Sequence, residues 1–378
     1  MQASTKINRR MMLAASTTAA LCGGAKAIAD QSFRKIRIAQ IGTSHAHASG
    51  KMEAILRLKE LYEVVGIAEP IRSQVATAKK QDVYKNLRWM SEEELLQDSS
   101  IEAVVVETTL DDSPRAASAC IEAGKHIHLD KPGAVSHPDF STLRSRAQEN
   151  GLAVQMGYML RYNPAFELLF LAHRKGWLGD ITDVNASMGK LADARLYEQL
   201  ASIPGHGMFE LGCHLVDSVV YLLGKPSFVH PIGKSTGLAS PTADQAIPDN
   251  QLALLEYPKA IATIRCNHGD PFGGPHRRFH VVGTKGAVEI DPLESGRGKI
   301  SLSQDQDLSQ IGDVKRYLGS LSLNKGVNRF ELVVPPGRYD GEFRDFARVL
   351  RGEKTLDWSA QHDIDTHATA LRCAGLAT

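Results

Sequence analysis

Residues 35–152 alternate short apolar strands with helices, and this order of elements restricts the fold more than any other feature of the chain. Four segments have the length and β-branched content of strands, namely Lys35–Ile41, Val64–Ala68, Ile101–Thr108 and His126–Leu129. The pattern Ser91-Glu92-Glu93-Glu94 predicts a capping box at the start of one intervening helix. Such alternation predicts a parallel sheet with right-handed crossovers, and the nearly unbroken apolar strands fit a sheet buried on both faces.

The pattern changes after Val154, where later segments alternate like antiparallel strands. We therefore expect an α/β protein with an N-terminal Rossmann-type parallel sheet domain over residues 33–153. A C-terminal α+β domain with a mainly antiparallel sheet should follow over residues 154–378, its final helix placed to pack back on the first domain. Its strands are expected at Thr182–Ser187, Gln251–Glu256, Ala260–Cys266, Arg278–Val282 and Ala287–Ile290. The exposed face of this sheet predicts a homo-oligomer, either a dimer or a tetramer.

The first 29 residues have the layout of a cleaved export signal. A basic start is followed by the apolar stretch Met11–Gly24 and by the small-x-small site Ala27-Ile28-Ala29. The pair Arg9-Arg10 resembles a twin-arginine signal, and an ordinary secretory signal is the alternative. The twin-arginine reading predicts an exported protein, periplasmic or extracellular, that uses the twin-arginine export machinery as a partner.

Composition excludes several classes of function. The chain has 44 Lys and Arg against 43 Asp and Glu, with no basic stripe that would indicate nucleic-acid binding. The mature chain shows no further apolar segment of the kind that spans a membrane. The 5 cysteines are scattered without a C-x-x-C pair, which argues against a zinc knuckle or a disulfide framework.

The run His126–Leu129 followed by Asp130-Lys131-Pro132 places a lysine directly after a buried strand. Ligands of open α/β sheets bind just outside the carboxyl ends of the strands. Pro132 also favours an extended conformation at Lys131. Lys131 is therefore a candidate to contact substrate, and a loop lysine before a turn proline is the alternative.

The segment Gly42–Gly50 after the first strand is the candidate cofactor loop, because a glycine at this point lets a dinucleotide pyrophosphate approach. The G-x-G-x-x-G pattern is broken, since Ser44 and His47 replace its second and third glycines. His45 and His47 could border the nicotinamide or substrate cleft or cap the helix. A metal pair is a third option, and no metal is expected because no carboxylate or cysteine lies nearby in sequence.

Glu69 ends the second strand at the distance expected for an acid that binds the ribose hydroxyls, which favours NAD. Arg72, three residues later, could instead bind the 2′-phosphate of NADP. NAD is therefore expected ahead of NADP.

The segment Gly205–Asp217 is the second candidate for chemistry. If a helix runs over Phe209–Leu223, Glu210 and His214 are four residues apart and share a face. A carboxylate beside an imidazole fixes its orientation and raises its basicity, which suits proton transfer near neutral pH. A surface Glu–His pair is the alternative, although the flanking apolar residues predict burial.

These ordered motifs together resemble the Gfo/Idh/MocA oxidoreductases, the glucose–fructose oxidoreductase and inositol dehydrogenase group. Ile101–Pro132 is similar to the strand units that end in the family's E-K-P motif, and Met156–Pro164 to its domain-crossing strand. Glu210–Asp217 resembles its D-x-G-x-H-x-x-D helix, and His280–Ile290 its late G-T-x-G segment. The resemblance covers nearly all of the mature chain.

The resemblance implies a hydride transfer between a nicotinamide and a sugar, polyol or derivative. Lys131 would stabilise the charge on the reacting oxygen, His214 would act as general base, and Glu210 would orient or assist that histidine. The expected cofactor contacts are Gly42, Thr43, Ser44, His45, His47, Glu69, Arg72, Thr108, Asp130 and Lys131. Arg161, Tyr162 and Asp217 are expected on the substrate side.

The chain departs from the family pattern at Asp130, at Glu210, at Leu110–Ser113 and in the glycine loop. An exported enzyme lacks a free nicotinamide pool, so we expect a tightly held cofactor that is recycled in place. Two alternatives remain, namely an NAD-dependent glycosidase of the same fold and a non-catalytic sugar-binding homologue.

Overall fold

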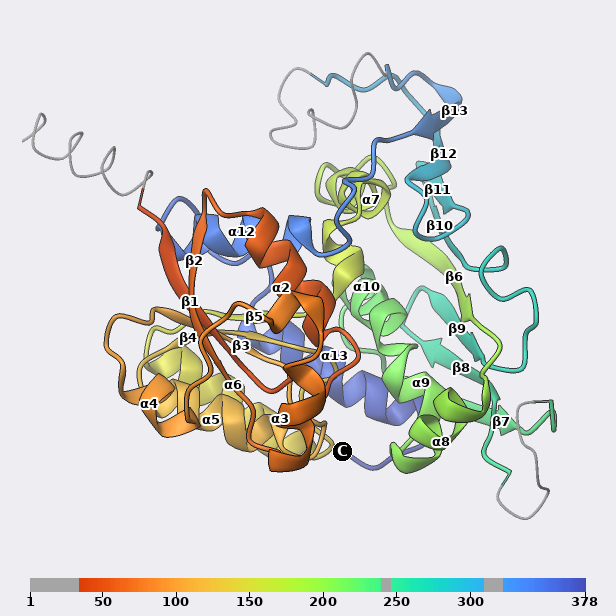
Figure 1. Ribbon diagram of the computed structural model, residues 1–378. Helices are drawn as coiled ribbons and strands as arrows, with labels where there is room; N and C mark the ends of the chain where they lie inside the picture. The colour runs from red at the N-terminus through yellow and green to blue at the C-terminus, as the bar shows by residue number, and fades with distance from the viewer. Residues whose placement is uncertain (1–33, 239–245, 309–321) are drawn as a thin grey trace, which may run out of the picture.

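The computed structural model describes residues 34–238, 246–308 and 322–378 (Figure 1). The expected leader, residues 1–29, lies outside these ranges, as does most of the expected loop Pro241–Pro248. Two sheets organise the described chain, one in each half. No described helix combines the length and the apolar character that a membrane span requires.

The first sheet is parallel, as expected, and its strand order is β2-β1-β3-β4-β5. Its strands are β1 (Ile36–Ile41), β2 (Tyr62–Ala68), β3 (Ala103–Val106), β4 (His126–Leu129) and β5 (Val154–Met156). The sequence did not predict β5, because three residues are too few to show a strand pattern. Since β5 pairs with β4, the sheet extends past the expected domain end at residue 153.

Helices cover both faces of this sheet. One face is packed by α2 (Ala48–Arg57) and α12 (Asp340–Leu350), and the other by α5 (Ser113–Glu122) and α6 (His137–Glu149) (Figure 1). The short helices α3 (Arg72–Ala78) and α4 (Glu92–Gln97) complete the domain, and Ser91 forms the predicted capping box with Glu94. Helix α12 comes from the far end of the chain, yet Phe343 and Phe346 join the core around Ile36 and Ile38.

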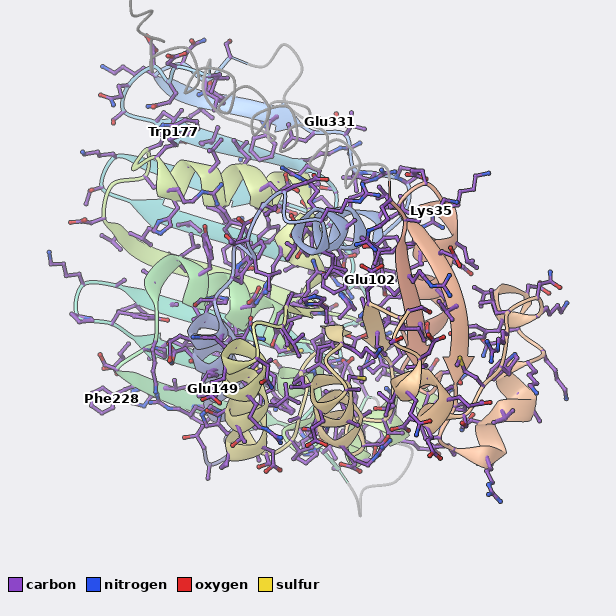
Figure 2. All side chains as sticks on the ribbon, turned by 90° about the vertical axis from the view of Figure 1, so that its left-hand side faces the viewer. Lys35, Glu102, Glu149, Trp177, Phe228 and Glu331 are labelled. Atoms are coloured by element: carbon purple, nitrogen blue, oxygen red, sulfur yellow. The ribbon has the colours of Figure 1, made fainter. Side chains whose placement is uncertain are left out.

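The second sheet has the strand order β13-β12-β11-β10-β6-β9-β8-β7 and is antiparallel except between β6 and β9. Its strands are β6 (Ile181–Gly189), β7 (Phe228–Lys234), β8 (Asn250–Glu256), β9 (Ile261–Asn267), β10 (Arg278–Gly283), β11 (Gly286–Ile290), β12 (Arg297–Leu302) and β13 (Gly326–Glu331). Phe228 and Glu331, on the two edge strands, lie far apart in Figure 2.

The helices that cover one face of the second sheet include α7 (Pro164–Arg174), α10 (Cys213–Leu223) and α13 (Ala360–Cys373). Helix α13, the last of the chain, also packs against α6 of the first domain. The other face exposes apolar side chains, including Ile261, Val282 and Val327.

The prediction of a single helix over Phe209–Leu223 is wrong. The chain instead forms α9 (His206–Glu210), and α10 begins only at Cys213. Gly212 allows the chain to pass close to Met208 at this break, because a Cβ at position 212 would lie 2.6 Å from the carbonyl oxygen of Met208. The break ends the simple i, i+4 relation between Glu210 and His214.

Candidate active site

A pocket of about 380 Å³ opens at the carboxyl ends of β1, β3 and β4. In the 2-1-3-4-5 strand order, the chain leaves β1 and β3 in opposite directions, and ligands bind at such a switch point. The second domain supplies the facing wall through α8 (Ala194–Ser202) and the segment that leads to Glu210. The lining residues include Ser44, His45, Thr108, Thr109, Asp130, Lys131, Arg195, Gln199 and Glu210.

The turn after β1 depends on Gly42. Its φ is 86°, and a Cβ there would lie 2.7 Å from the backbone of Glu107 and Thr108. Two residues later, the buried Ser44 Oγ has no hydrogen-bond partner within the described chain. This loop leads into α2, whose first backbone N–H groups attract anions. The loop therefore fits the phosphates of a dinucleotide, although it lacks the standard glycines.

Glu69 lies beside this loop and holds it in place. Glu69 Oε2 accepts hydrogen bonds from Thr43 N at 2.6 Å and Thr43 Oγ1 at 2.5 Å. Glu69 Oε1 accepts a third from Ile71 N at 2.8 Å. Arg72 is exposed as the first residue of α3. The carboxylate keeps lone pairs for a ribose hydroxyl, so the expected preference for NAD stays a prediction.

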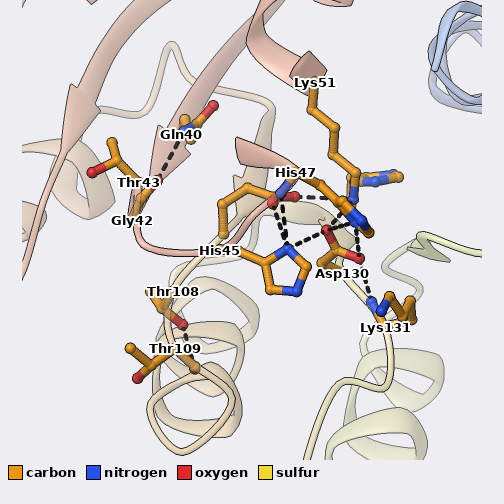
Figure 3. A network of polar contacts seen from close by, with 12 residues as sticks. Gln40, Gly42, Thr43, His45, His47, Lys51, Thr108, Thr109, Asp130 and Lys131 are labelled. Atoms are coloured by element: carbon orange, nitrogen blue, oxygen red, sulfur yellow. Dashed lines mark hydrogen bonds and ion pairs between the residues drawn. The ribbon is translucent and has the colours of Figure 1, made fainter. Parts of the chain in front are cut away.

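Asp130 joins the cofactor loop to the end of β4. Figure 3 shows His45, His47 and Lys51 directed at this carboxylate. Asp130 Oδ2 lies 2.9 Å from His45 Nδ1, 3.0 Å from His47 Nδ1 and 2.8 Å from Lys51 Nζ. Asp130 Oδ1 accepts a hydrogen bond from Lys131 N at 2.6 Å. Asp130 therefore fixes the loop, the helix and the backbone of Lys131 relative to one another.

Lys51 is fully buried on α2 and lies next to three buried carboxyl groups, those of Glu107, Asp130 and Glu342. Burial opposes ionisation of Asp130, but His45 and Lys51 outweigh it and lower the pKa of Asp130 well below its usual value. Burial raises the pKa of Glu107 well above its usual value, and that of Glu342 to about 8. The Lys51 ammonium is therefore paired with the Asp130 carboxylate, while burial favours the protonated forms of Glu107 and Glu342.

Lys131 is 2 % exposed, and its Nζ donates to Glu210 O at 2.6 Å and to Glu210 Oε1 at 2.7 Å. Burial alone would raise the pKa of Glu210, but the Lys131 ammonium lowers it to about 2. The pairing expected between Glu210 and His214 is thus replaced by an ion pair between the two domains. Sequence spacing could not show this pair, because it joins residues 79 positions apart.

His214 is buried on α10, and its Nδ1 has no hydrogen-bond partner within the described chain. Burial, and then the nearby Lys131 charge, lower the pKa of His214 well below its usual value. The Glu210 carboxylate acts in the expected direction and raises the pKa of His214, but burial outweighs it, so the imidazole is neutral at neutral pH. Its ring packs edge-on against Tyr158, with the two ring centroids 5.8 Å apart.

The three residues expected on the substrate side have other partners. Arg161 is buried and donates to Asp217 at 2.6 Å and to Asp363 at 2.7 Å. Tyr162 Oη accepts a hydrogen bond from Gln155 Nε2 at 2.8 Å. None of Arg161, Tyr162 and Asp217 lines the pocket at the sheet edge. The structure places Arg161 and Asp217 in an ion network with Asp363 that joins η2 (Met159–Tyr162), α10 and α13.

Sequence reasoning missed Lys51, Glu107, Arg195 and Glu342 at or behind the pocket. Lys51 follows His47 by one helical turn, and Glu107 follows the last residue of β3, so both had a positional signal. Glu342 had no such signal in the sequence, because α12 reaches the first sheet only through the tertiary fold.

Two family descriptions match successive parts of the chain. Residues 36–158 match an oxidoreductase family with an NAD-binding Rossmann fold, and residues 172–289 match the GFO/IDH/MocA C-terminal domain. The chain belongs to the Gfo/Idh/MocA oxidoreductase family. This membership agrees with the resemblance drawn from the motifs and makes the protein an NAD(P)-dependent dehydrogenase.

Several curated relatives of this chain are named dehydrogenases. Scyllo-inositol 2-dehydrogenase (NADP(+)) IolW of Bacillus subtilis (strain 168) is 25% identical over 285 residues, which cover 72% of this chain and 76% of that protein. Trans-1,2-dihydrobenzene-1,2-diol dehydrogenase of Bos taurus is 26% identical over 240 residues, with coverages of 62% and 68%.

Solved structures share the fold. Levoglucosan dehydrogenase, in complex with NADH and levoglucosan, superposes with a TM-score of 0.73 at 15% identity over 90% of this chain and 97% of that chain. The WlbA dehydrogenase of Bordetella pertussis, in complex with NADH and UDP-GlcNAcA, gives a TM-score of 0.69 at 18% identity, with coverages of 90% and 96%.

Proposed function

We propose that this family member oxidises or reduces a secondary alcohol or ketone of a sugar, polyol or derivative. The observation that carries the proposal is the Lys131 ammonium, held beside the pocket between the cofactor loop and the second domain. A fixed cation at this position stabilises the negative charge on the oxygen of a carbinol as its hydroxyl proton leaves, and on the oxygen of a ketone as hydride adds to its carbon. A nicotinamide, when bound, supplies the hydride acceptor or donor.

Lys131 is prepared for this role by its partner. An ammonium has three N–H donors, and Glu210 accepts two of them through its carbonyl and carboxylate oxygens. The third has no acceptor within the described ranges and can donate to a substrate oxygen. Burial disfavours the charge on Lys131, but the Glu210 carboxylate outweighs burial and raises the pKa of the lysine. Glu210 therefore acts as a positioning residue that keeps Lys131 protonated.

His214 is the candidate proton acceptor. Its neutral imidazole has a free lone pair, because the low pKa keeps it unprotonated at neutral pH. Such an imidazole accepts a hydroxyl proton only while the neighbouring ammonium stabilises the alkoxide, so Lys131 and His214 act together.

The names of the relatives support a CH–OH substrate, since they mention an inositol, a dihydrodiol and levoglucosan. We further propose that the cofactor is NAD, retained through turnover, and that the protein is exported. The position of Glu69 beside the loop favours NAD, while one relative is named for NADP. The open face of the second sheet, with Ile261, Val282 and Val327 exposed, supports a homo-oligomer.

Native mass spectrometry of the purified full chain tests cofactor retention directly. We expect a nicotinamide dinucleotide mass on the folded protein, and a protein free of nucleotide would refute tight binding. A panel of sugars, polyols and glycosides then follows the nicotinamide absorbance. Aglycone release without net change in absorbance would favour the glycosidase alternative.

Substitutions separate catalysis from binding. Lys131→Ala and His214→Ala should each lower hydride transfer by about a hundredfold or more on the best substrate while the nucleotide stays bound. The control is Lys325→Ala, at an exposed lysine of the second domain. Unchanged rates in both active-site variants would exclude this mechanism.

A further inference from the structure

We propose that His45, His47 and Asp130 form a binding site for a divalent transition-metal ion in the wall of the active-site pocket. In the part of the chain that the structure describes, these residues are the one group of three His, Cys, Asp or Glu side chains arranged to hold an ion. Their donor atoms all lie within 4.8 Å of one another. The sequence argued against a metal because no carboxylate is near the histidines, and the fold supplies Asp130 from the end of β4.

The contacts of His45 Nδ1 favour a cation between this nitrogen and Asp130. A ring nitrogen carries either a proton or a lone pair in the ring plane, never both. His45 Nδ1 lies 3.3 Å from the backbone N of His47, which can only donate, and 2.9 Å from Asp130 Oδ2, which as a carboxylate can only accept. A single protonation state of the ring cannot satisfy both neighbours. A cation bound to the lone pair and to Asp130 would satisfy the carboxylate and the imidazole together.

His47 completes the set from the same loop. Its Nδ1 lies 3.0 Å from Asp130 Oδ2 and 3.3 Å from Asp130 Oδ1. The two imidazoles meet edge to face, with ring centroids 4.7 Å apart, so both nitrogens converge on one carboxylate (Figure 3). Ligands of a tetrahedral ion at about 2.0–2.2 Å are separated by roughly 3.3–3.6 Å. The distances of 2.9 Å and 3.0 Å from the two Nδ1 atoms to Asp130 Oδ2 are a little shorter than this.

A second carboxylate lies behind this group. Glu107 is fully buried, and its Oε2 lies 3.6 Å from His45 Nδ1. Neither of its oxygens has a hydrogen bond within the described chain, and its nearest cation is Lys51, 3.0 Å from Oε1. Lys51 also contacts Asp130 Oδ2, as expected for a hydrogen bond that orients a ligating carboxylate. Glu107 is therefore placed behind the group as a partner that orients His45.

The ligand chemistry identifies the class of ion. Two imidazoles and a carboxylate suit zinc, manganese, iron or cobalt, and exclude calcium and magnesium, which prefer all-oxygen sites. His45 and Asp130 line the pocket, so the remaining coordination positions face it. A substrate hydroxyl or carbonyl oxygen would fill one of them, next to the Lys131 ammonium. The ion and Lys131 would then polarise the same oxygen.

Metal content tests this site without any assay of catalysis. The full chain is dialysed against EDTA and titrated with zinc chloride or manganese chloride by calorimetry. We expect one ion per chain and a rise in Tm. His45→Gln and His47→Gln should each weaken binding by about tenfold or more. The matched control is His276→Ala, because His276 also pairs with a carboxylate, that of Asp270 at 2.8 Å, but has no second histidine beside it.

Absence of binding by either ion to folded wild-type protein at millimolar concentration would overturn the site. Equal binding by wild type and both histidine variants would also overturn it, as would a loss in His276→Ala of the same size. If the variants do not fold, X-ray absorption of the metal-loaded wild type decides, since two imidazole ligands are expected and none would refute the proposal. Nucleotide retention is read separately by native mass spectrometry, so the site and the proposed dehydrogenase function can fail independently.

Discussion

Glu342→Gln is expected to make the protein more stable at alkaline pH while leaving it unchanged in acid. Glu342 is fully buried on α12, and neither carboxyl oxygen has a hydrogen-bond partner within the described chain. The closest ring nitrogen, His128 Nε2, is 3.4 Å from Oε2. Burial raises the pKa of Glu342 from 4.5 to about 8, although Lys51 partly offsets it. Glutamine has the shape of the protonated acid and never has to ionise.

The sign of the effect follows from proton linkage. Between the unfolded and folded pKa values, the folded state holds a proton that the unfolded state has released, so stability falls as pH rises through this window. Each unit of pKa shift corresponds to about 1.36 kcal/mol, which gives a cost of about 5 kcal/mol above roughly pH 8. Local opening of α12 would admit water to the carboxylate, so this figure is an upper limit. Glu342→Gln removes the cost.

Urea unfolding of wild type and variant at roughly pH 5, 7 and 9 measures the difference. The stabilisation by Glu342→Gln should be close to zero at the acid end and reach a few kcal/mol at the alkaline end. Glu331→Gln, at an exposed glutamate of β13, is the control and should show no such trend. A stabilisation that does not change with pH would refute the reasoning.

Three further outcomes can be measured. Gly42→Ala should weaken nucleotide binding and destabilise the fold by about 1–3 kcal/mol, whereas Gly326→Ala, also at positive φ but with open space around it, should cost less and leave binding intact. Arg161→Met should lower the free energy of unfolding by about 3–5 kcal/mol, because Asp217 and Asp363 lose their shared cation, and the exposed Arg297→Met should have little effect in the same urea titration. Glu210→Gln removes the charge that raises the pKa of Lys131, so the alkaline loss of hydride transfer should begin at lower pH, and an unchanged pH–rate profile would contradict this.

Local sequence was sufficient wherever local forces decide the structure. The strand His126–Leu129 and the capping box at Ser91 appear as predicted, because both depend on residues within a few positions of one another. The place of Lys131 beside the pocket followed from the strand that precedes it and from the parallel sheet.

Long-range contacts account for what the sequence could not show. The helix expected through Leu211 and Gly212 breaks there, and Glu210 then reaches Lys131 in the other domain. Periodicity could not reveal the break, because a short apolar run with one glycine is compatible with a continuous helix. Arg161 and Asp217 were expected on the substrate side because they stand in motifs, but Arg161 pairs with Asp217 itself and with Asp363 of the last helix.

The packing of α12 on the first sheet determines when the nucleotide domain can be completed. Phe343 and Phe346 cover the face formed by Ile36, Ile38 and Val105. During synthesis, helix α2 covers part of this face early, and the rest stays uncovered until α12 has left the ribosome. The Rossmann domain therefore cannot complete its core before α12 is synthesised. A fragment that ends at β5 would expose part of this apolar face and tend to aggregate.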